Sequence, residues 1–329
     1  MADLGNPRSS KTMTRRKWLI WSGSSVGLLG VGGGTLYAKQ AGLVDAVGAT
    51  LHTMRDHRIA DLSGAVLGIA HGLSPEKNVR AALDAIGGMK RFVSSTDRVL
   101  IKPNIAWDKR PELGATTDPR VVAELVRACR DVGVENVRVL DCPVDDPNRT
   151  YQRTGILEAA RAAGAKVLLP AESEYAYVNI AGYQLPWAIR DTFLWADKII
   201  NVPIAKHHGS AKVTAGMKNW IGVTDKGRSR FHASLNESIV ALAELVRPTL
   251  TVIDATRILL RNGPRGGNLD DVQVTNTVVA STDPVAADAW ACDLLGTARS
   301  KVPYLELAEK RGLGKADWKN VVHRELQLG

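Results

Sequence analysis

The sequence predicts an α/β protein with a mostly parallel sheet covered by helices on both faces. Short β-branched runs alternate along the chain with segments whose apolar residues recur every three or four positions. Alternation of this kind is typical of parallel sheets, because parallel strands need crossover connections that are usually helical. The alternation starts near residue 65 and continues towards the end of the 329-residue chain. We find no internal repeat and expect a single α/β domain over residues 63–329.

Each expected strand is an apolar run that ends at a polar or turn-forming residue. The predicted strands cover residues 65–70, 98–102, 136–141, 166–169, 199–204, 249–254 and 275–280. Helices are expected where a capping residue and a proline precede an apolar stripe. The predicted helices start within the segments 74–76, 116–119 and 283–284 or cover residues 150–163, 234–245 and 303–310. Residues 175–186 read as a β excursion outside this alternation, which predicts an antiparallel edge or a flap.

The N-terminal segment has the pattern of an export signal. The motif Thr14-Arg15-Arg16-Lys17-Trp18-Leu19 precedes an uncharged, glycine-rich apolar stretch that extends to Ala38. Paired arginines before a weakly hydrophobic core resemble a twin-arginine signal. A short membrane anchor is the alternative, since about 20 apolar residues can span a bilayer. We expect residues 1–38 to be this signal or anchor and residues 39–62 to be a polar, partly helical spacer.

The signal predicts a periplasmic or other extracytoplasmic protein that is a partner of the twin-arginine export machinery. Contact with a membrane is expected only through an uncleaved N-terminal segment. The formal net charge is +9, but the basic residues are scattered and no nucleic-acid-binding motif accompanies them. This pattern favours a cationic site over nucleic-acid binding. Cys129, Cys142 and Cys292 are far apart in the sequence, so a ferredoxin-type iron–sulfur cluster is not expected.

The stretch from residue 198 to residue 223 gathers the groups best suited to chemistry. It reads KIINVPIAKHHGSAKVTAGMKNWIGV, in which an apolar run delivers Lys206, His207 and His208 at the carboxyl end of a strand. Open α/β sheets bind ligands at this edge. Neighbouring strand residues point to opposite faces, so only one of the two histidines can easily face a given ligand. We expect it to be His208. A lysine before a helix is unfavourable for the helix dipole, so Lys218 indicates an anionic ligand.

Other loops at the same edge add candidates. Lys102 and Asn104 follow one predicted strand and Asp141 ends another, although each could simply cap its loop. His232, after the basic segment 228–230, is expected to reach the site from a loop. We expect His208 and Lys218 to be catalytic, and His208 with Asp141 to hold any metal. The residues expected to bind an anionic small molecule are Lys102, Asn104, Lys206, Thr214, Asn219 and Asn262.

Several motifs in the same order resemble the family called domain of unknown function 362. They are Lys102-Pro103-Asn104, Thr116-Thr117-Asp118-Pro119, Lys218-Asn219-Trp220-Ile221-Gly222, Asn262-Gly263-Pro264 and Asp283-Pro284-Val285-Ala286-Ala287-Asp288. The resemblance covers about residues 65–297. The family has no settled reaction. Its members are often described as iron–sulfur proteins because many carry an appended ferredoxin module, a description that the cysteines of this chain do not match.

A shorter segment is similar to the lactate racemase family. In that family a histidine ten residues before a lysine helps to hold a nickel-pincer nucleotide, and the lysine bears this cofactor. His208 and Lys218 have the same spacing, with Thr214-Ala215-Gly216 between them. The resemblance implies a metal or a nucleotide-derived cofactor as one option.

These observations predict an exported protein whose cationic crevice binds an anionic small molecule or cofactor. If it is an enzyme, the expected reaction is of the racemase or redox type on a carboxylate substrate. His208 or an aspartate would then move a proton, while Lys218 stabilises the developing negative charge. The alternative is a non-catalytic periplasmic binding or assembly protein that uses the same crevice.

Overall fold

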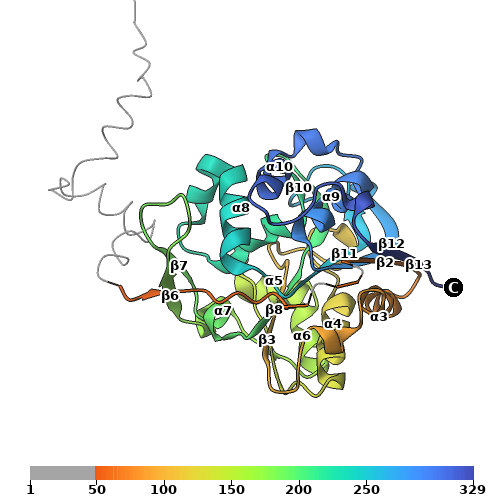
Figure 1. The fold of residues 1–329 in the computed structure, drawn as a ribbon, viewed down its shortest axis with the longest axis horizontal. Coiled ribbons are helices and arrows are strands. Elements are labelled where there is room, and N and C mark those ends of the chain that lie inside the picture. The colour runs from red at the N-terminus through yellow and green to blue at the C-terminus, as the bar shows by residue number, and fades with distance from the viewer. Residues whose placement is uncertain (1–48, 62, 65) are drawn as a thin grey trace, which may run out of the picture.

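A ten-stranded sheet forms the centre of the fold in the computed structural model, which describes residues 49–61, 63–64 and 66–329 (Figure 1). The expected signal, 1–38, and the first part of the expected spacer lie outside the described residues. The main path of the sheet runs β13 (His323–Gln327), β2 (Leu67–His71), β12 (Val272–Ser281), β11 (Leu250–Leu259), β8 (Lys198–Val202), β3 (Arg98–Pro103), β4 (Asn136–Val139) and β5 (Lys166–Val167). Along this path only the two pairings made by β12 are antiparallel. The predicted mostly parallel sheet is therefore confirmed.

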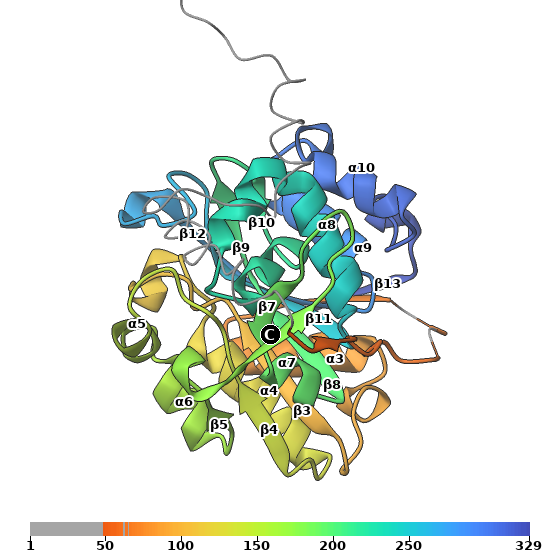
Figure 2. The same cartoon turned by 90° about the vertical axis from the view of Figure 1, so that its left-hand side faces the viewer.

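Helices cover both faces of the sheet (Figures 1 and 2). One face packs against α3 (Pro75–Ala85), α4 (Pro119–Asp131), α5 (Pro147–Arg153) and α6 (Ile156–Ala162). The other face packs against α7 (Thr192–Trp195), α8 (Leu235–Val246), α9 (Pro284–Leu294) and α10 (Pro303–Lys310). Successive residues of a buried strand divide between the two cores, as Leu100 and Ile101 do. The apolar runs are continuous because both faces are buried.

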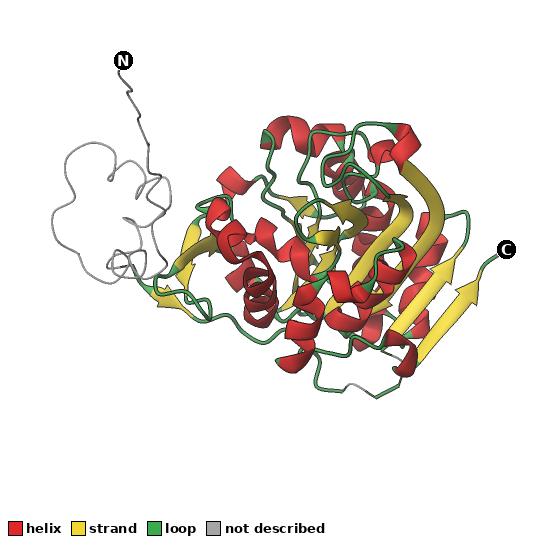
Figure 3. Cartoon of the chain, turned by 90° about the horizontal axis from the view of Figure 1, so that it is seen from above, coloured by secondary structure: helices red, strands yellow, loops and turns green. Residues whose placement is uncertain are grey.

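The predicted β excursion forms a separate three-stranded sheet. Strands β6 (Tyr175–Val178) and β7 (Trp187–Arg190) make an antiparallel hairpin, and β1 (Leu51–His52) adds in parallel to β6. Figure 3 shows this small sheet at the side of the molecule. Strand β1 belongs to the expected spacer, whose described part, 49–61, contains this strand instead of a helix. In this described part, β1 pairs with β6 and His57 is buried.

The predicted central strand is divided at Pro203. Strand β8 pairs with β3 and β11, whereas β9 (Ile204–His208) pairs with the second half of β11 and with β10 (Lys212–Thr214). Proline has no backbone N–H for the ladder, so the strand bends there. Lys206 and His208 therefore lie at the end of a separate strand, β9, and not at the end of one continuous strand as expected.

Other boundaries differ for local reasons. The predicted helix over 150–163 is two helices separated by Gly155, which has a φ of +71°. Strands β11 and β12 extend beyond the predicted segments into a long antiparallel arm, and β13 was not predicted. Within the described part of the chain, no helix is long and apolar enough to span a bilayer.

Candidate functional site

A cavity of about 390 Å³ opens at the carboxyl edge of the sheet, where the ends of β3 and β4 meet β9. Its walls also include β10, the loop 261–267 and two 3₁₀ segments, η4 (Met217–Val223) and η5 (Arg228–Ser234). The volume suits a small molecule. The lining residues are Asn104, Ala106, Trp107, Asp141, Cys142, Val144, Lys206, His208, Thr214, Lys218, Asn219, Ile221, Gly222, Arg228, Ser229, His232 and Pro264.

The structure brings most of the predicted site residues to this cavity. Those that line it are Asn104, Asp141, Lys206, His208, Thr214, Lys218, Asn219 and His232. Lys102 lies beneath the lining, fully buried. Asn262 is not brought to the cavity, because it is exposed and its Nδ2 donates to Asp271 Oδ2 at 2.7 Å. From the loop 261–267, Pro264 lines the cavity.

The hairpin of β9 and β10 sets which side chains face the cavity. Lys206 and His208 lie two residues apart on β9 and so share a face, whereas His207 points away from the cavity. The Nδ1 atom of His207 accepts a hydrogen bond from the backbone N–H of Gly263 at 3.1 Å. The strand alternation therefore selects His208, as the sequence predicted.

His208 is held as a neutral hydrogen-bond donor. Its Nδ1 atom accepts hydrogen bonds from the backbone N–H groups of Ser210 and Ala211, each at 3.2 Å. Burial, together with the charges of Lys218 and Lys206, lowers the pKa of His208 to about 3. The imidazole proton must then reside on Nε2, because Nδ1 is occupied as an acceptor. The ring consequently offers an N–H to the cavity, not a lone pair.

Three cationic side chains line the cavity. Burial and the nearby ammonium of Lys218 lower the pKa of Lys206 to about 7, and its Nζ donates to the carbonyl of Ala115. Burial and the charge of Arg228 lower the pKa of Lys218 to about 8. No residue in the described part of the chain forms an ion pair or hydrogen bond with the Lys218 ammonium. Arg228 donates to the carbonyl of Pro143 at 2.9 Å and has no carboxylate partner among the described residues.

Amide side chains fix the floor of the cavity. Asn219 Nδ2 donates to Asn201 Oδ1 at 2.9 Å, and Asn219 Oδ1 accepts from Asn104 Nδ2 at 3.1 Å. Asn104 Oδ1 in turn accepts from Lys206 Nζ at 3.4 Å. A buried amide network of this kind has one satisfied arrangement, so it sets the orientation of every member.

The carboxylate of Asp141 is already neutralised. Its Oδ1 atom accepts from Lys102 Nζ at 2.6 Å and its Oδ2 atom accepts from the backbone N–H of Ile105 at 2.7 Å. Because Asp141 has both oxygens engaged and His208 presents an N–H, this pair does not fit the metal site that the sequence suggested. No group of three or more histidine, cysteine, aspartate or glutamate side chains suited to a metal occurs in the described part of the chain. A nucleotide-derived cofactor stays a prediction.

The segment η5 is anchored to the small sheet. The ring of Phe231 stacks on Trp187 with centroids 3.9 Å apart, and Arg190 pairs with Asp225 at 2.7 Å. These contacts hold η5 where it contributes Arg228 to the cavity. The basic segment 228–230 in the sequence had indicated this part of the site. Trp107 also lines the cavity, but in the sequence only its position three residues after Asn104 could have indicated this.

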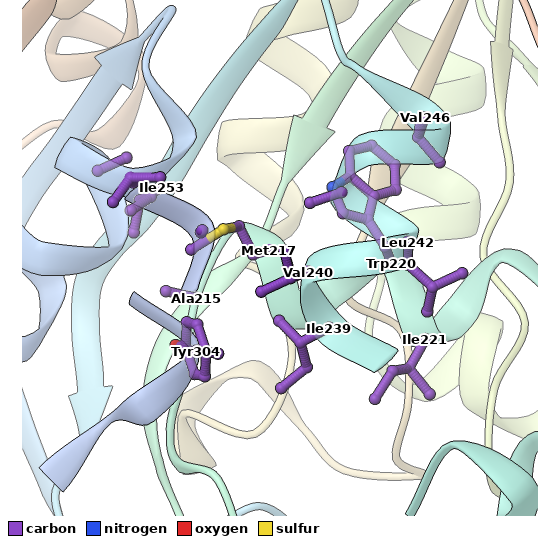
Figure 4. Packing of buried hydrophobic residues seen from close by; sticks show 14 of the residues in the cluster. Ala215, Met217, Trp220, Ile221, Ile239, Val240, Leu242, Val246, Ile253 and Tyr304 are labelled. Atoms are coloured by element: carbon purple, nitrogen blue, oxygen red, sulfur yellow. The ribbon is translucent and has the colours of Figure 1, made fainter. Parts of the chain in front are cut away.

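The apolar side chains of η4 anchor the opposite wall. Figure 4 shows Met217 and Trp220 packed among residues of α8, with Tyr304 of α10 beside Ala215. Each of these side chains is buried. The polar residues between them, Lys218 and Asn219, are left to face the cavity.

The model of the family described as "Domain of unknown function (DUF362)" matches residues 99–293, which is more than half of the chain. The chain belongs to the DUF362 family. Among curated proteins, this DUF362 protein is 28% identical over 245 residues to a thylakoid-associated protein of Synechocystis sp., covering 72% of this chain and 74% of the relative. The resemblance inferred from the sequence motifs is thus confirmed.

Two solved structures are similar to this DUF362 protein. One is the lactate racemase apoprotein of Thermoanaerobacterium thermosaccharolyticum, with 12% identity, a TM-score of 0.47 and 74% of this chain covered. The other is a protein of Thermotoga maritima, with 9% identity, a TM-score of 0.35 and 72% of this chain covered. In both comparisons the match spans 58% of the solved chain.

Proposed function

We propose that this DUF362 protein binds a small organic anion in the cavity and exchanges a proton with it. One observation supports the binding: Lys206, Lys218 and Arg228 line one cavity whose single lining carboxylate, on Asp141, is already paired with Lys102. Cationic groups in a partly dehydrated pocket attract anions more strongly than they would in water. Apolar side chains, including Trp107, share the lining. They favour an organic body over a bare inorganic ion.

We infer roles for His208 and Lys218 that are the reverse of those the sequence suggested, with Lys218 moving the proton and His208 stabilising the negative charge. A group with a pKa of about 8, such as Lys218, has both protonation states populated near neutral pH. On a carboxylate substrate its amine would take the proton from the α carbon, leaving the electron pair on an enolate, and would later return that proton. The Nε2–H of His208 would donate to the oxygen on which negative charge develops.

The test is a binding screen followed by an exchange measurement. Purified protein is titrated by calorimetry with short-chain carboxylates that carry a hydrogen on the α carbon, such as 2-hydroxy acids, and with phosphate and sulfate. Compounds that bind are then incubated with the protein in D₂O, and deuterium at the α carbon is followed by NMR. We expect exchange that Lys218→Met abolishes. The control is Lys212→Met, which changes an exposed lysine of the same hairpin that is not part of the cavity lining.

The possible results separate the two functional classes. Binding that depends on Lys218 without any exchange would contradict the enzymatic part and support the binding or assembly protein. Equal affinity in the wild type and in Lys218→Met would contradict the anion site itself.

The proposal includes an extracytoplasmic or membrane-associated location. The twin-arginine motif at residues 14–19 supports it, as does the thylakoid association of the Synechocystis relative. Replacing Arg15 and Arg16 together by lysine should leave the protein in the cytoplasmic fraction. Unchanged export of this variant would contradict the assigned route.

A further inference from the structure

Asp288, in the middle of α9, is an unusual group for a hydrophobic core. Its side chain is fully buried, and no lysine or arginine of the described residues pairs with it. Two backbone amides bind it: Oδ1 accepts from Gly216 N–H at 2.6 Å and Oδ2 accepts from Met217 N–H at 3.1 Å. The hydroxyl of Tyr304 lies beside the same carboxyl group and also favours its charged form. Burial raises the pKa of Asp288 to about 7 in spite of these hydrogen bonds. A carboxyl group in this place therefore costs stability and calls for a compensating role.

The two amides bound by Asp288 belong to the turn that leads directly into Lys218 and Asn219. The same turn is held from the sheet side, because Asn201 Nδ2 donates to the carbonyl of Gly216 at 2.8 Å. The backbone N–H of Asn219 also donates to Gly216 O, at 3.2 Å. Asp288 and Asn201 thus fix the turn from two elements, α9 and β8.

Glycine at position 216 allows the close approach of the carboxylate. A Cβ atom added there would lie 2.8 Å from Asp288 Oδ1 and 3.0 Å from Thr251 Cγ2. Both contacts are closer than side chains normally tolerate, and both atoms belong to buried residues. The contact between α9 and the turn is therefore direct.

We propose that Asp288 is a positioning residue of the cavity, whose carboxylate fixes the turn at Gly216 and Met217 so that Lys218 and Asn219 face the bound anion. The proposal rests on the proposed function, since it takes Lys218 as an anion-binding group. It also gives a role to the end of the motif at residues 283–288. Asp283 caps α9 through Val285 N–H and Ala286 N–H, but Asp288 makes no helix cap.

The test compares Asp288→Asn with Asp283→Asn. Both changes replace a carboxylate by an amide of the same shape on the same helix. Asparagine at position 283 can still cap the helix, and it loses only the hydrogen bond from Lys315 N–H to Oδ2, which lies outside the turn. At position 288 an amide nitrogen must face one of two backbone N–H groups, so one hydrogen bond to the turn is lost. We therefore expect only Asp288→Asn to displace Lys218.

The first readout needs no ligand. Competitive acetylation with acetic anhydride is carried out across a pH series and read by mass spectrometry. The dependence of Lys218 acetylation on pH gives its titration midpoint. Acetylation of the exposed Lys212 corrects for changes in the reagent concentration. In the wild type we expect a midpoint near the lowered pKa of about 8. We expect Asp288→Asn to move it towards the ordinary 10.5, because a displaced lysine is better hydrated. Asp283→Asn should leave it unchanged.

The second readout is the affinity for sulfate, a dianion whose charge is constant over this pH range, measured by calorimetry. Asp288→Asn should weaken it about tenfold, the equivalent of one lost charge-assisted hydrogen bond. Gly216→Ala disturbs the same contact from the other side and should act in the same direction. It serves as the second variant if Asp288→Asn does not fold.

The outcomes keep the two proposals apart. A Lys218 midpoint and a sulfate affinity that both stay at the wild-type values in Asp288→Asn and in Gly216→Ala would overturn the positioning role. A wild-type protein that binds neither sulfate nor any carboxylate of the screen but shows the low Lys218 midpoint would count against the anion site. The shift of that midpoint in Asp288→Asn would still decide the role of Asp288.

Discussion

Replacement of Gly222 by alanine should destabilise the protein strongly. A Cβ atom at this position would lie 2.2 Å from Asp141 Oδ1 and 2.9 Å from Lys102 Nζ. Asp141 cannot retreat freely, because Oδ1 bonds Lys102 at 2.6 Å and Oδ2 bonds the Ile105 amide at 2.7 Å. The added methyl group must therefore open a fully buried ion pair. Breaking such a pair costs about 3 to 5 kcal/mol, a large part of the stability of an ordinary domain.

The free energy of unfolding from guanidinium denaturation, followed by tryptophan fluorescence and circular dichroism, measures this loss. The matched control is Gly209→Ala, since Gly209 is exposed and a Cβ atom there would meet nothing within 4 Å. We expect the control to stay within about 0.5 kcal/mol of the wild type. A loss of less than about 1 kcal/mol in Gly222→Ala would refute the reasoning, because Asp141 and Lys102 would then accommodate the added methyl group without losing their ion pair.

Three further predictions concern the cavity. Thr214 Oγ1 is buried without a hydrogen-bond partner, so Thr214→Val should leave the melting temperature unchanged or raised while weakening the affinity for the bound anion in calorimetry; a marked loss of stability would contradict this. Long-range ¹H–¹⁵N NMR should show His208 as the Nε2–H tautomer with no ring protonation down to about pH 4, since its pKa is lowered to about 3; an imidazolium signal at pH 6 would be inconsistent with the geometry. Lys218 and Lys206, with pKa values of about 8 and about 7, both lose charge between pH 7 and pH 9, so sulfate affinity should be higher at pH 7 than at pH 9, and Lys218→Met should reduce this difference without abolishing it; an equal pH dependence in the variant would assign it to another group.

Local sequence patterns predicted the parts of the fold that local physics determines. Capping residues with proline, as at Asp118 and Asp283, marked helix starts that the structure has at the following residue. Strand ends predicted the edge at which Lys206 and Lys218 lie, since the carboxyl ends of parallel strands meet there. Period-two alternation predicted that only one of His207 and His208 faces the cavity, and the structure places His208 there.

Features that depend on distant partners could not be predicted in this way. Pro203 was visible in the sequence, but the partner that β9 takes after the bend, the far half of β11, was not. Asn262 follows a predicted strand region, yet a long β arm and its contact with Asp271 carry it away from the cavity. The bond between Asp288 and the turn at Gly216 joins residues 72 positions apart, and no spacing rule links them.

The position of β2 in the sheet has a consequence for how the chain folds. This strand is the first of the large sheet in sequence, but both of its neighbours, β12 and β13, come from residues 272–281 and 323–327. During synthesis, some two hundred residues must therefore follow β2 before either of its edges can pair, and Leu67 and Ile69 stay unpaired until then. Contacts of such high sequence separation slow folding and leave an unpaired edge open to aggregation. We expect the unfinished chain to depend on a chaperone at this strand, and refolding from denaturant to be limited by the late docking of β12 beside it.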